Sequence, residues 1–134
     1  MTITAKLQFG NNDLHIYNQE YLVVECNIHS AREYDAFHPT SLAQDRSIQV
    51  TVVAQSSADL SLQEWYYKQT PQTGRLLLEM TDYSNNADAN REILFEDAVC
   101  YWLEERYDIN DNNRRLIVLK FVTEKTTIDD VDLN

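Results

Sequence analysis

The sequence predicts a mainly β fold: a small barrel or sandwich of about seven strands with one short α-helix. Several segments alternate apolar and polar residues with a period of two, which is typical of half-buried strands. Only one segment has helical spacing. Turn residues separate the strands at the short intervals found in sandwiches and barrels. With 134 residues, the chain has the length of one domain, and we expect a single domain over residues 1–134.

The first four strands follow from alternation and from turn residues. Residues 2–9 predict a strand, Gly10–Asp13 a turn, and residues 14–17 the return arm of a hairpin. Residues 21–29 and 47–54 predict two further strands. The residues expected on their apolar faces are Ile3, Ala5, Leu7 and Phe9; then Leu22, Val24, Cys26 and Ile28; then Ile48, Val50, Val52 and Ala54.

Residues 31–45 lose this period and predict a long loop. Loops of about 15 residues without secondary structure are uncommon and usually have a function. The helix is predicted to begin near Asp59, where Ser61 and Glu64 have the spacing of a capping box. Pro71 is expected to end it, because the residue before a proline disfavours helical geometry.

The C-terminal half predicts a strand at residues 75–83, a polar loop at 84–90 and a long hairpin formed by 91–106 and 114–123. Apolar residues occupy both faces of the first arm, which one copy of the chain could not cover alone. One face is expected to carry Ile93, Phe95, Val99, Tyr101 and Leu103, and the other Leu94, Ala98, Cys100 and Trp102. From about Thr127 the sequence becomes an acidic tail, which we expect to be flexible.

Composition and charge argue against several classes of function. The net charge is −11, from 22 acidic and 11 basic residues, so nucleic acid is not an expected partner. Two glycines leave no phosphate-binding loop. No apolar run approaches the ~18 residues of a membrane span, and the N-terminus lacks the apolar core of a signal peptide. We therefore expect cytoplasmic synthesis and no membrane insertion.

No motif indicates catalysis. The three histidines, His15, His29 and His38, lack metal-site spacing, and the cysteines lack a CxxC pattern. The paired carboxylates Glu96–Asp97 and Glu104–Glu105 are strand neighbours that point to opposite faces. We expect no catalytic residue, no cofactor and no metal.

The order of these elements resembles the tube proteins of type VI secretion systems, the haemolysin-coregulated Hcp or TssD family, in the form found in Bacteroidetes. The resemblance covers nearly the whole chain. It rests on the helix with Leu62 and Trp65 and on the later strand Phe95-Glu96-Asp97-Ala98-Val99-Cys100. One departure is Gln44-Asp45-Arg46, where relatives commonly have a glycine before the fourth strand.

The resemblance implies a structural protein that forms six-membered rings, which stack into a hollow tube. Implied partners are further copies of the chain, the sheath, spike and baseplate proteins, and effectors, and the tube is implied to be exported from the cell. Two alternatives stay open: a tube protein of a phage tail or an extracellular contractile injection particle, and a monomeric ligand-binding β-barrel.

Three sets of residues are candidates for contacts within such a tube. Tyr34, Phe37 and His38 give the long loop aromatic anchors suited to ring stacking. Arg106, Arg114 and Arg115 are candidates for ion pairs with acids of a neighbouring subunit. A polar face suited to a wet channel is expected from Thr2, Thr4, Gln8, Gln49 and Thr51.

Overall fold

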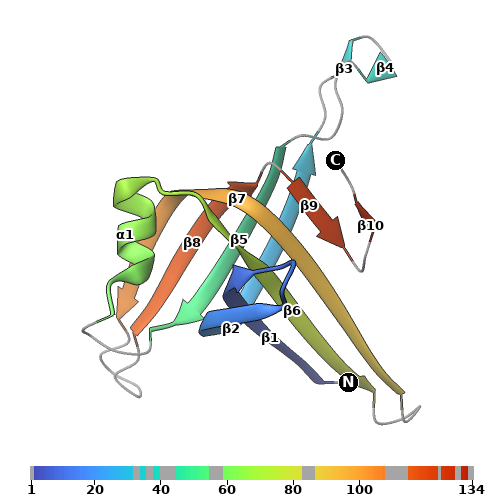
Figure 1. The fold of residues 1–134 in the computed structure, drawn as a ribbon, viewed down its shortest axis with the longest axis horizontal. Helices are drawn as coiled ribbons and strands as arrows, with labels where there is room; N and C mark the ends of the chain where they lie inside the picture. The colour runs from blue at the N-terminus through green and yellow to red at the C-terminus, as the bar shows by residue number, and fades with distance from the viewer. Residues whose placement is uncertain are drawn as a thin grey trace.

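Six long antiparallel strands form a closed barrel in the computed structural model (Figure 1). They are β1 (Thr2–Asn11), β2 (Ile16–Ala31), β5 (Asp45–Val53), β6 (Gln72–Asp82), β7 (Ala87–Tyr107) and β8 (Arg115–Thr123). The order is β7-β6-β1-β2-β5-β8, and pairing of β7 with β8 closes the barrel. The mainly β prediction is thereby confirmed.

The remaining elements are short. β9 (Lys125–Ile128) pairs with β7, and β10 (Val131–Asp132) pairs with β9. β3 (Tyr34–Asp35) and β4 (His38–Pro39) pair with each other in a separate two-stranded sheet. The structure describes residues 2–31, 34–35, 38–39, 45–54, 59–82, 87–107, 115–123, 125–128 and 131–132.

The helix α1 (Ser61–Lys68) covers one end of the barrel (Figure 1). The expected capping box is wrong: Leu60 is the N-cap, with no side-chain cap bond, and Ser61 is already the first helical residue. Asp59 instead accepts a hydrogen bond at the start of the helix: the Ser61 backbone N–H donates to its Oδ1 at 3.0 Å. The helix ends at Lys68, before Pro71, because Gln69 adopts the left-handed conformation with φ 53°.

β2 differs from its prediction in length and in orientation. It is one continuous strand, where the sequence predicted a return arm and a separate strand. Tyr21 and Val23 point into the barrel, whereas Leu22 and Val24 are exposed. A bulge after Val23 shifts the register, which places Cys26 against the core.

β7 also breaks the strict alternation that the sequence predicted. Two register shifts add one residue each, the first near Glu96–Asp97 and the second after Cys100. Asp97 has φ 52°, and its backbone N–H donates to Thr73 Oγ1 at 3.3 Å. Ile93, Phe95, Ala98 and Cys100 consequently all face the core, although they were assigned to two faces.

Secondary structure extends into the segments predicted as loops. β2 runs to Ala31, β3 and β4 lie within residues 31–45, and β7 begins at Ala87, inside the expected loop 84–90. Thr127 and Ile128 belong to β9, at the start of the expected tail. The hairpin of β7 and β8 matches the predicted pairing of 91–106 with 114–123.

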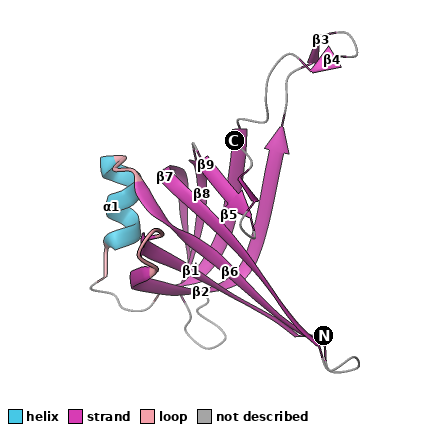
Figure 2. Ribbon diagram, turned by 45° about the vertical axis from the view of Figure 1, so that its right-hand side comes forward, coloured by secondary structure: helices cyan, strands magenta, loops and turns pink. Residues whose placement is uncertain are grey.

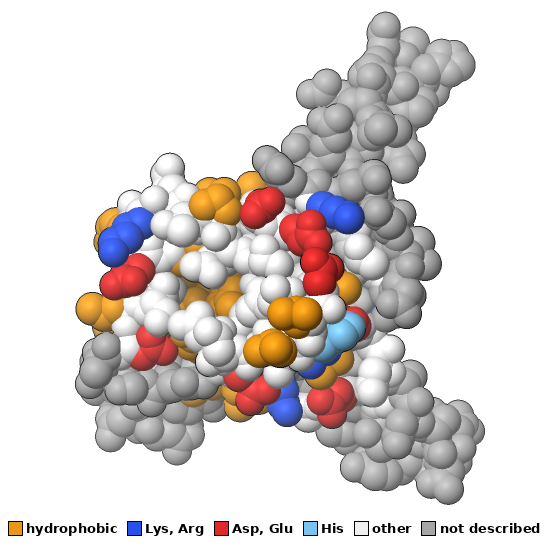
Figure 3. All heavy atoms as spheres, viewed as in Figure 1, with side chains coloured by type: hydrophobic (Ala, Val, Ile, Leu, Met, Phe, Trp, Pro, Cys, Tyr) orange, Lys and Arg blue, Asp and Glu red, His pale blue; other side chains and the backbone are white. Residues whose placement is uncertain are grey.

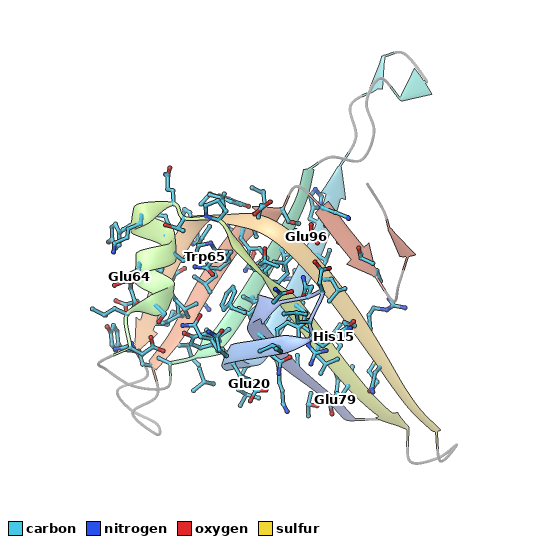
Figure 4. The ribbon with its side chains drawn as sticks, in the orientation of Figure 1. His15, Glu20, Glu64, Trp65, Glu79 and Glu96 are labelled. Carbon is cyan, nitrogen blue, oxygen red and sulfur yellow. The ribbon has the colours of Figure 1, made fainter. Side chains whose placement is uncertain are left out.

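Four aromatic rings from the barrel strands pack with the Trp65 ring of α1 at this end of the barrel. Phe9 contacts Trp65 with ring centroids 5.1 Å apart, and Trp65 contacts Phe121 at the same distance. Trp65 points from α1 toward the barrel strands (Figure 4), and its Nε1–H donates to the Ala98 carbonyl at 3.0 Å. Tyr21 and Phe95 complete the cluster. The helix is therefore locked to the barrel by one buried indole.

Candidate functional site: exposed surfaces of the barrel

An apolar cleft opens at the end of the barrel away from α1. β1 and β2 are paired from Asn11↔Ile16 to Ala5↔Val23, and beyond that point the two strands diverge. β1, β6 and β7 run toward one corner of the molecule and β2 and β5 toward another (Figures 1 and 2). The apolar cleft between them has a volume of about 390 Å³ and is lined mainly by Ile3, Ala5, Val23, Val24, Cys26, Ile28, Leu78 and Met80.

Large apolar side chains in this cleft remain in contact with solvent. Ile3 is 60% exposed, and Val24 is 47% exposed. Burial of such side chains is favourable by roughly 25 cal/mol per Å² of apolar area. Since several of them share one concave surface, the apolar cleft has the character of an interaction site.

A second exposed surface, here called the aromatic face, lies on the outside of β7 and β8. It consists of Tyr101, Trp102 and Val122; Tyr101 is 48% exposed and Trp102 47%. Tyr101 and Ser47 share a hydroxyl–hydroxyl hydrogen bond of 2.6 Å. Lys120 Nζ lies 4.6 Å from the centre of the Trp102 ring. These contacts hold the aromatic rings against the sheet while their outer faces stay accessible.

The two surfaces lie on opposite sides of the barrel. In the closed order of six strands, β8 lies three strands from β1 in either direction. The apolar cleft centres on β1 and β2, and the aromatic face on β7 and β8. A copy of the chain thus presents one apolar surface on each side.

The outer side of β1 and β6 is polar and connected by hydrogen bonds. Gln8 Nε2 donates to Glu20 at 2.7 Å, and Arg75 Nε donates to Gln8 Oε1 at 2.6 Å. Arg75 also forms an ion pair with Glu92. Gln8 and the exposed Thr4 therefore belong to a polar surface, whereas Thr51, expected on a wet face, is 4% exposed. The side chain of Thr51 is covered by its neighbours, so its assignment to a wet face is wrong.

The candidate arginines interact within their own chain. Arg106 Nε lies 3.2 Å from Glu104 Oε1, and both side chains are about half exposed. The Arg115 carbonyl accepts from the Ala54 N–H at 3.0 Å, and the Arg115 charge helps to lower the pKa of Asp59. Arg114 lies outside the described residues.

The loop candidates are only partly placed. Tyr34 begins β3 and His38 begins β4, while Phe37 lies outside the described residues. Of the residues that carried the family resemblance, Leu62, Trp65, Phe95, Ala98 and Cys100 are buried in the core. Glu96 is partly buried and Asp97 exposed, both at the first bulge of β7.

The two thiols are poorly suited to nucleophilic chemistry. Burial raises the pKa of both Cys26 and Cys100 to about 11, so both are protonated at neutral pH. Among the described His, Cys, Asp and Glu side chains, no group of three or more gathers as a metal site. Within the described ranges, no helix combines the length and the apolar character needed to cross a bilayer.

Solved structures share this fold. Hcp1 from Flavobacterium johnsoniae aligns over 100% of this chain and 99% of its own, with a TM-score of 0.64 and 16% identity. Hcp1 from Salmonella typhimurium covers 96% of this chain and 86% of its own, with a TM-score of 0.60 and 11% identity. A chain of the anti-feeding prophage baseplate covers 98% and 95%, with a TM-score of 0.52 and 11% identity.

No curated protein matches this chain in sequence. The family model described as "Hemolysin coregulated protein Hcp (TssD)" matches residues 1–134, the whole chain. The fold and the full-length family match agree with the order of elements and motifs in the sequence. The chain belongs to the Hcp (TssD) family and is a structural subunit of the inner tube of a type VI secretion system.

Proposed function

We propose that the chain builds its tube ring by seating the aromatic face of each copy in the apolar cleft of the next. The observation that carries this proposal is the presence of two exposed apolar surfaces on opposite sides of one barrel. When two different surfaces of identical copies pair, the contact is heterologous, and a suitable rotation per copy closes the assembly into a ring. Six copies of 15.7 kDa form a ring of about 94 kDa.

The two surfaces are chemically matched. Trp102 and Tyr101 are large, stiff side chains, of the kind enriched at the centres of interfaces. The cleft offers aliphatic side chains and no charged group other than Glu25 in its lining. Lys120, which lies over the Trp102 ring, is available to approach that carboxylate across the interface. The charge pair would fix the register of the contact.

Rings also stack, and the segment 31–45 is our candidate for that contact, with Tyr34, Phe37 and His38 as its anchors. Arg106, Arg114 and Arg115 remain candidates for charge pairing between subunits. Family membership supports sheath, spike and baseplate proteins and effectors as further partners, and export by the secretion machine. It equally supports a structural role without catalysis or cofactors.

Sedimentation velocity tests the ring contact with two single variants. Trp102→Glu disables the aromatic face, and Val24→Glu disables the apolar cleft; both sites are half exposed, so the barrel itself should fold. Each variant alone is expected to run as a monomer near 15.7 kDa. Leu14→Glu is the matched control, because Leu14 is exposed on the β1–β2 turn outside both surfaces, and this variant should keep its rings.

Mixing the two variants separates a heterologous contact from a symmetric one. One intact cleft and one intact aromatic face remain in the mixture, so it should yield dimers of about 31 kDa, twice the chain mass, and no rings. Rings from either single variant would contradict the assigned surfaces. A 15.7 kDa particle from the unsubstituted chain at micromolar concentration would instead favour the monomeric ligand-binding barrel.

A further inference from the structure

A pocket beside α1 shares no lining residue with the apolar cleft or the aromatic face. The buried side chains of Phe9, Leu62 and Trp65 form its floor, and the exposed Glu64 and Lys68 stand at its rim. Figure 3 shows it as a hollow with a hydrophobic floor on the face turned to the viewer. Its volume is about 280 Å³, just below the ~300–1,000 Å³ typical of small-molecule sites. The size suits a ligand no larger than a single amino acid.

The rim carries one acid and one base that the chain itself does not pair. Glu64 and Lys68 are one helical turn apart, a spacing at which opposite charges commonly form an ion pair. No ion pair joins them in the part of the chain that the structure describes. Exposed pairs of this kind are weak, so a ligand that contacts both charges has little to displace.

The charges of the pocket select the chemistry of the ligand. The lining side chains other than Glu64 and Lys68 are uncharged, so the lining as a whole is neutral but has one pole of each sign. A simple anion would bind Lys68 and be repelled by Glu64, and a simple cation would meet the reverse. A zwitterion satisfies both poles, and it avoids the repulsion that a chain with a net charge of −11 exerts on anions.

We propose that the pocket beside α1 binds a free α-amino acid with an apolar side chain. The ammonium group of the ligand pairs with Glu64, its carboxylate pairs with Lys68, and its side chain lies on the floor at Leu62 and Trp65. An α-amino acid carries both charges on one carbon, which suits two partners on one helix face. The inference is independent of the proposed ring contact, because the pocket uses other residues.

Tryptophan fluorescence tests the pocket with L-leucine as the probe. The chain has two tryptophans, Trp65 and Trp102, so Trp102→Phe leaves the indole at the pocket floor as the only one. We expect L-leucine to change the Trp65 emission in a saturable way. Two analogues each lack one charge: isoamylamine has no carboxylate, and isocaproate has no ammonium group. Each should bind roughly tenfold more weakly than L-leucine, because each loses one charged partner.

Two variants assign the charges to their partners. Glu64→Gln should abolish the preference for L-leucine over isocaproate, because the ammonium group loses its partner. Lys68→Met should abolish the preference for L-leucine over isoamylamine, because the carboxylate loses its partner. Both positions are exposed, so both variants should fold. Glu79→Gln is the matched control, since Glu79 lies on β6 away from α1 (Figure 4), and it should keep both preferences.

The same titrations give the outcomes that would overturn the site. They are the absence of a saturable change in emission with L-leucine, equal binding of L-leucine and its two analogues, or unchanged preferences in both Glu64→Gln and Lys68→Met. None of these outcomes bears on ring assembly, which sedimentation measures separately.

Discussion

The two ends of the barrel differ in how their apolar side chains are covered. At the end under α1, the rings of Phe9, Tyr21, Trp65, Phe95 and Phe121 pack on one another within one copy. At the other end, Ile3, Val24 and Ile28 remain exposed around the apolar cleft. The aromatic rings at the first end are covered within a single chain, whereas apolar side chains at the second end stay in contact with solvent. In the proposed ring, the open end is the part of the barrel that a neighbouring copy covers.

Strand pairing explains the difference. Near α1, β1 pairs on both sides, with β2 through Asn11↔Ile16 and with β6 through Phe9↔Gly74. Toward Thr2 it keeps only β6, because β2 turns away after Val23 to pair with β5. The divergence opens the core between the strands. A helix fills the corresponding gap at one end, and no described element fills it at the other.

The largest expected effect comes from breaking the closed end. Trp65→Ala removes a buried indole that contacts two phenylalanine rings and donates to the Ala98 carbonyl. We expect a loss of about 3–5 kcal/mol in the free energy of unfolding, measured by urea denaturation. Tyr67→Ala, on the same helix but 76% exposed, should change stability by less than about 0.5 kcal/mol. Similar losses for both variants would mean that α1 does not lock the barrel.

The next effect comes from the close approach of β1 and β6. A Cβ atom at Gly74 would lie 2.1 Å from the Gln8 backbone oxygen, so Gly74→Ala must push the two strands apart. We expect a loss of about 1–3 kcal/mol by urea denaturation. Gln72→Ala in the same strand is the control and should cost less. An unchanged midpoint for Gly74→Ala would show that the pairing at Phe9 can widen freely.

A smaller effect concerns the hydrogen bonds at the start of α1. Hydrogen bonds from Ser61 lower the pKa of Asp59, and the Tyr21 hydroxyl adds a bond of 3.1 Å. A lowered folded-state pKa contributes stability above the ordinary carboxyl pKa of 3.8, and this stability is lost as the pH falls through the folded value. Asp59→Asn should cost about 0.5–1.5 kcal/mol at pH 7 and less at pH 3. An equal cost at both pH values would contradict this role.

The pH dependence of stability above pH 10 tests the contribution of Tyr21. Burial, with Asp59 nearby, raises the pKa of Tyr21 from 10 to about 12. The folded state thus holds the proton more tightly, so stability should decline as the pH rises from 10 toward 12. Tyr21→Phe should remove this part of the decline in urea titrations. A decline that is unchanged in the variant would assign it to other groups.

The sequence was sufficient for most of the closed end and misleading for the open end. Alternation correctly predicted that Ala5, Leu7 and Phe9 of β1 point inward, but it also placed Ile3 on that face, and Ile3 is exposed. It likewise predicted the buried Ile48, Val50 and Val52 of β5, and helical spacing correctly predicted that Leu62 and Trp65 face the core. The same alternation assigned Leu22 and Val24 to the core, and both are exposed. Tyr21 and Val23 take the inward positions instead, because the pairing of β1 with β2 decides which face is buried.

The bulges of β7 account for the other misassignment. Strict alternation places Ile93 and Phe95 on one face of the strand and Ala98 and Cys100 on the other. All four face the core, because an added residue at Glu96–Asp97 reverses the alternation. Asp97 tolerates the left-handed conformation better than most residues, but a single aspartate is too weak a signal to locate a bulge. The aromatic face has the same origin, since both Tyr101 and Trp102 are exposed beside the second bulge. The exposed surfaces that we propose for ring assembly therefore depend on register, which the sequence does not determine by itself.

Substitutions in the apolar cleft at the open end are expected to have the smallest effect on stability. They test directly whether the two ends of the barrel differ. Val24→Ser and Ile3→Ser replace side chains that are about half exposed or more, so each should change the unfolding free energy of a ring-deficient Trp102→Glu chain by less than about 0.5 kcal/mol. In the otherwise unsubstituted chain, the same changes should weaken ring assembly, because each removes apolar area that the neighbour would bury. Sedimentation over a dilution series measures that loss. If the two serine variants instead destabilised the monomer as strongly as Gly74→Ala, the apolar cleft would belong to the core, and both ends of the barrel would be completed within a single chain.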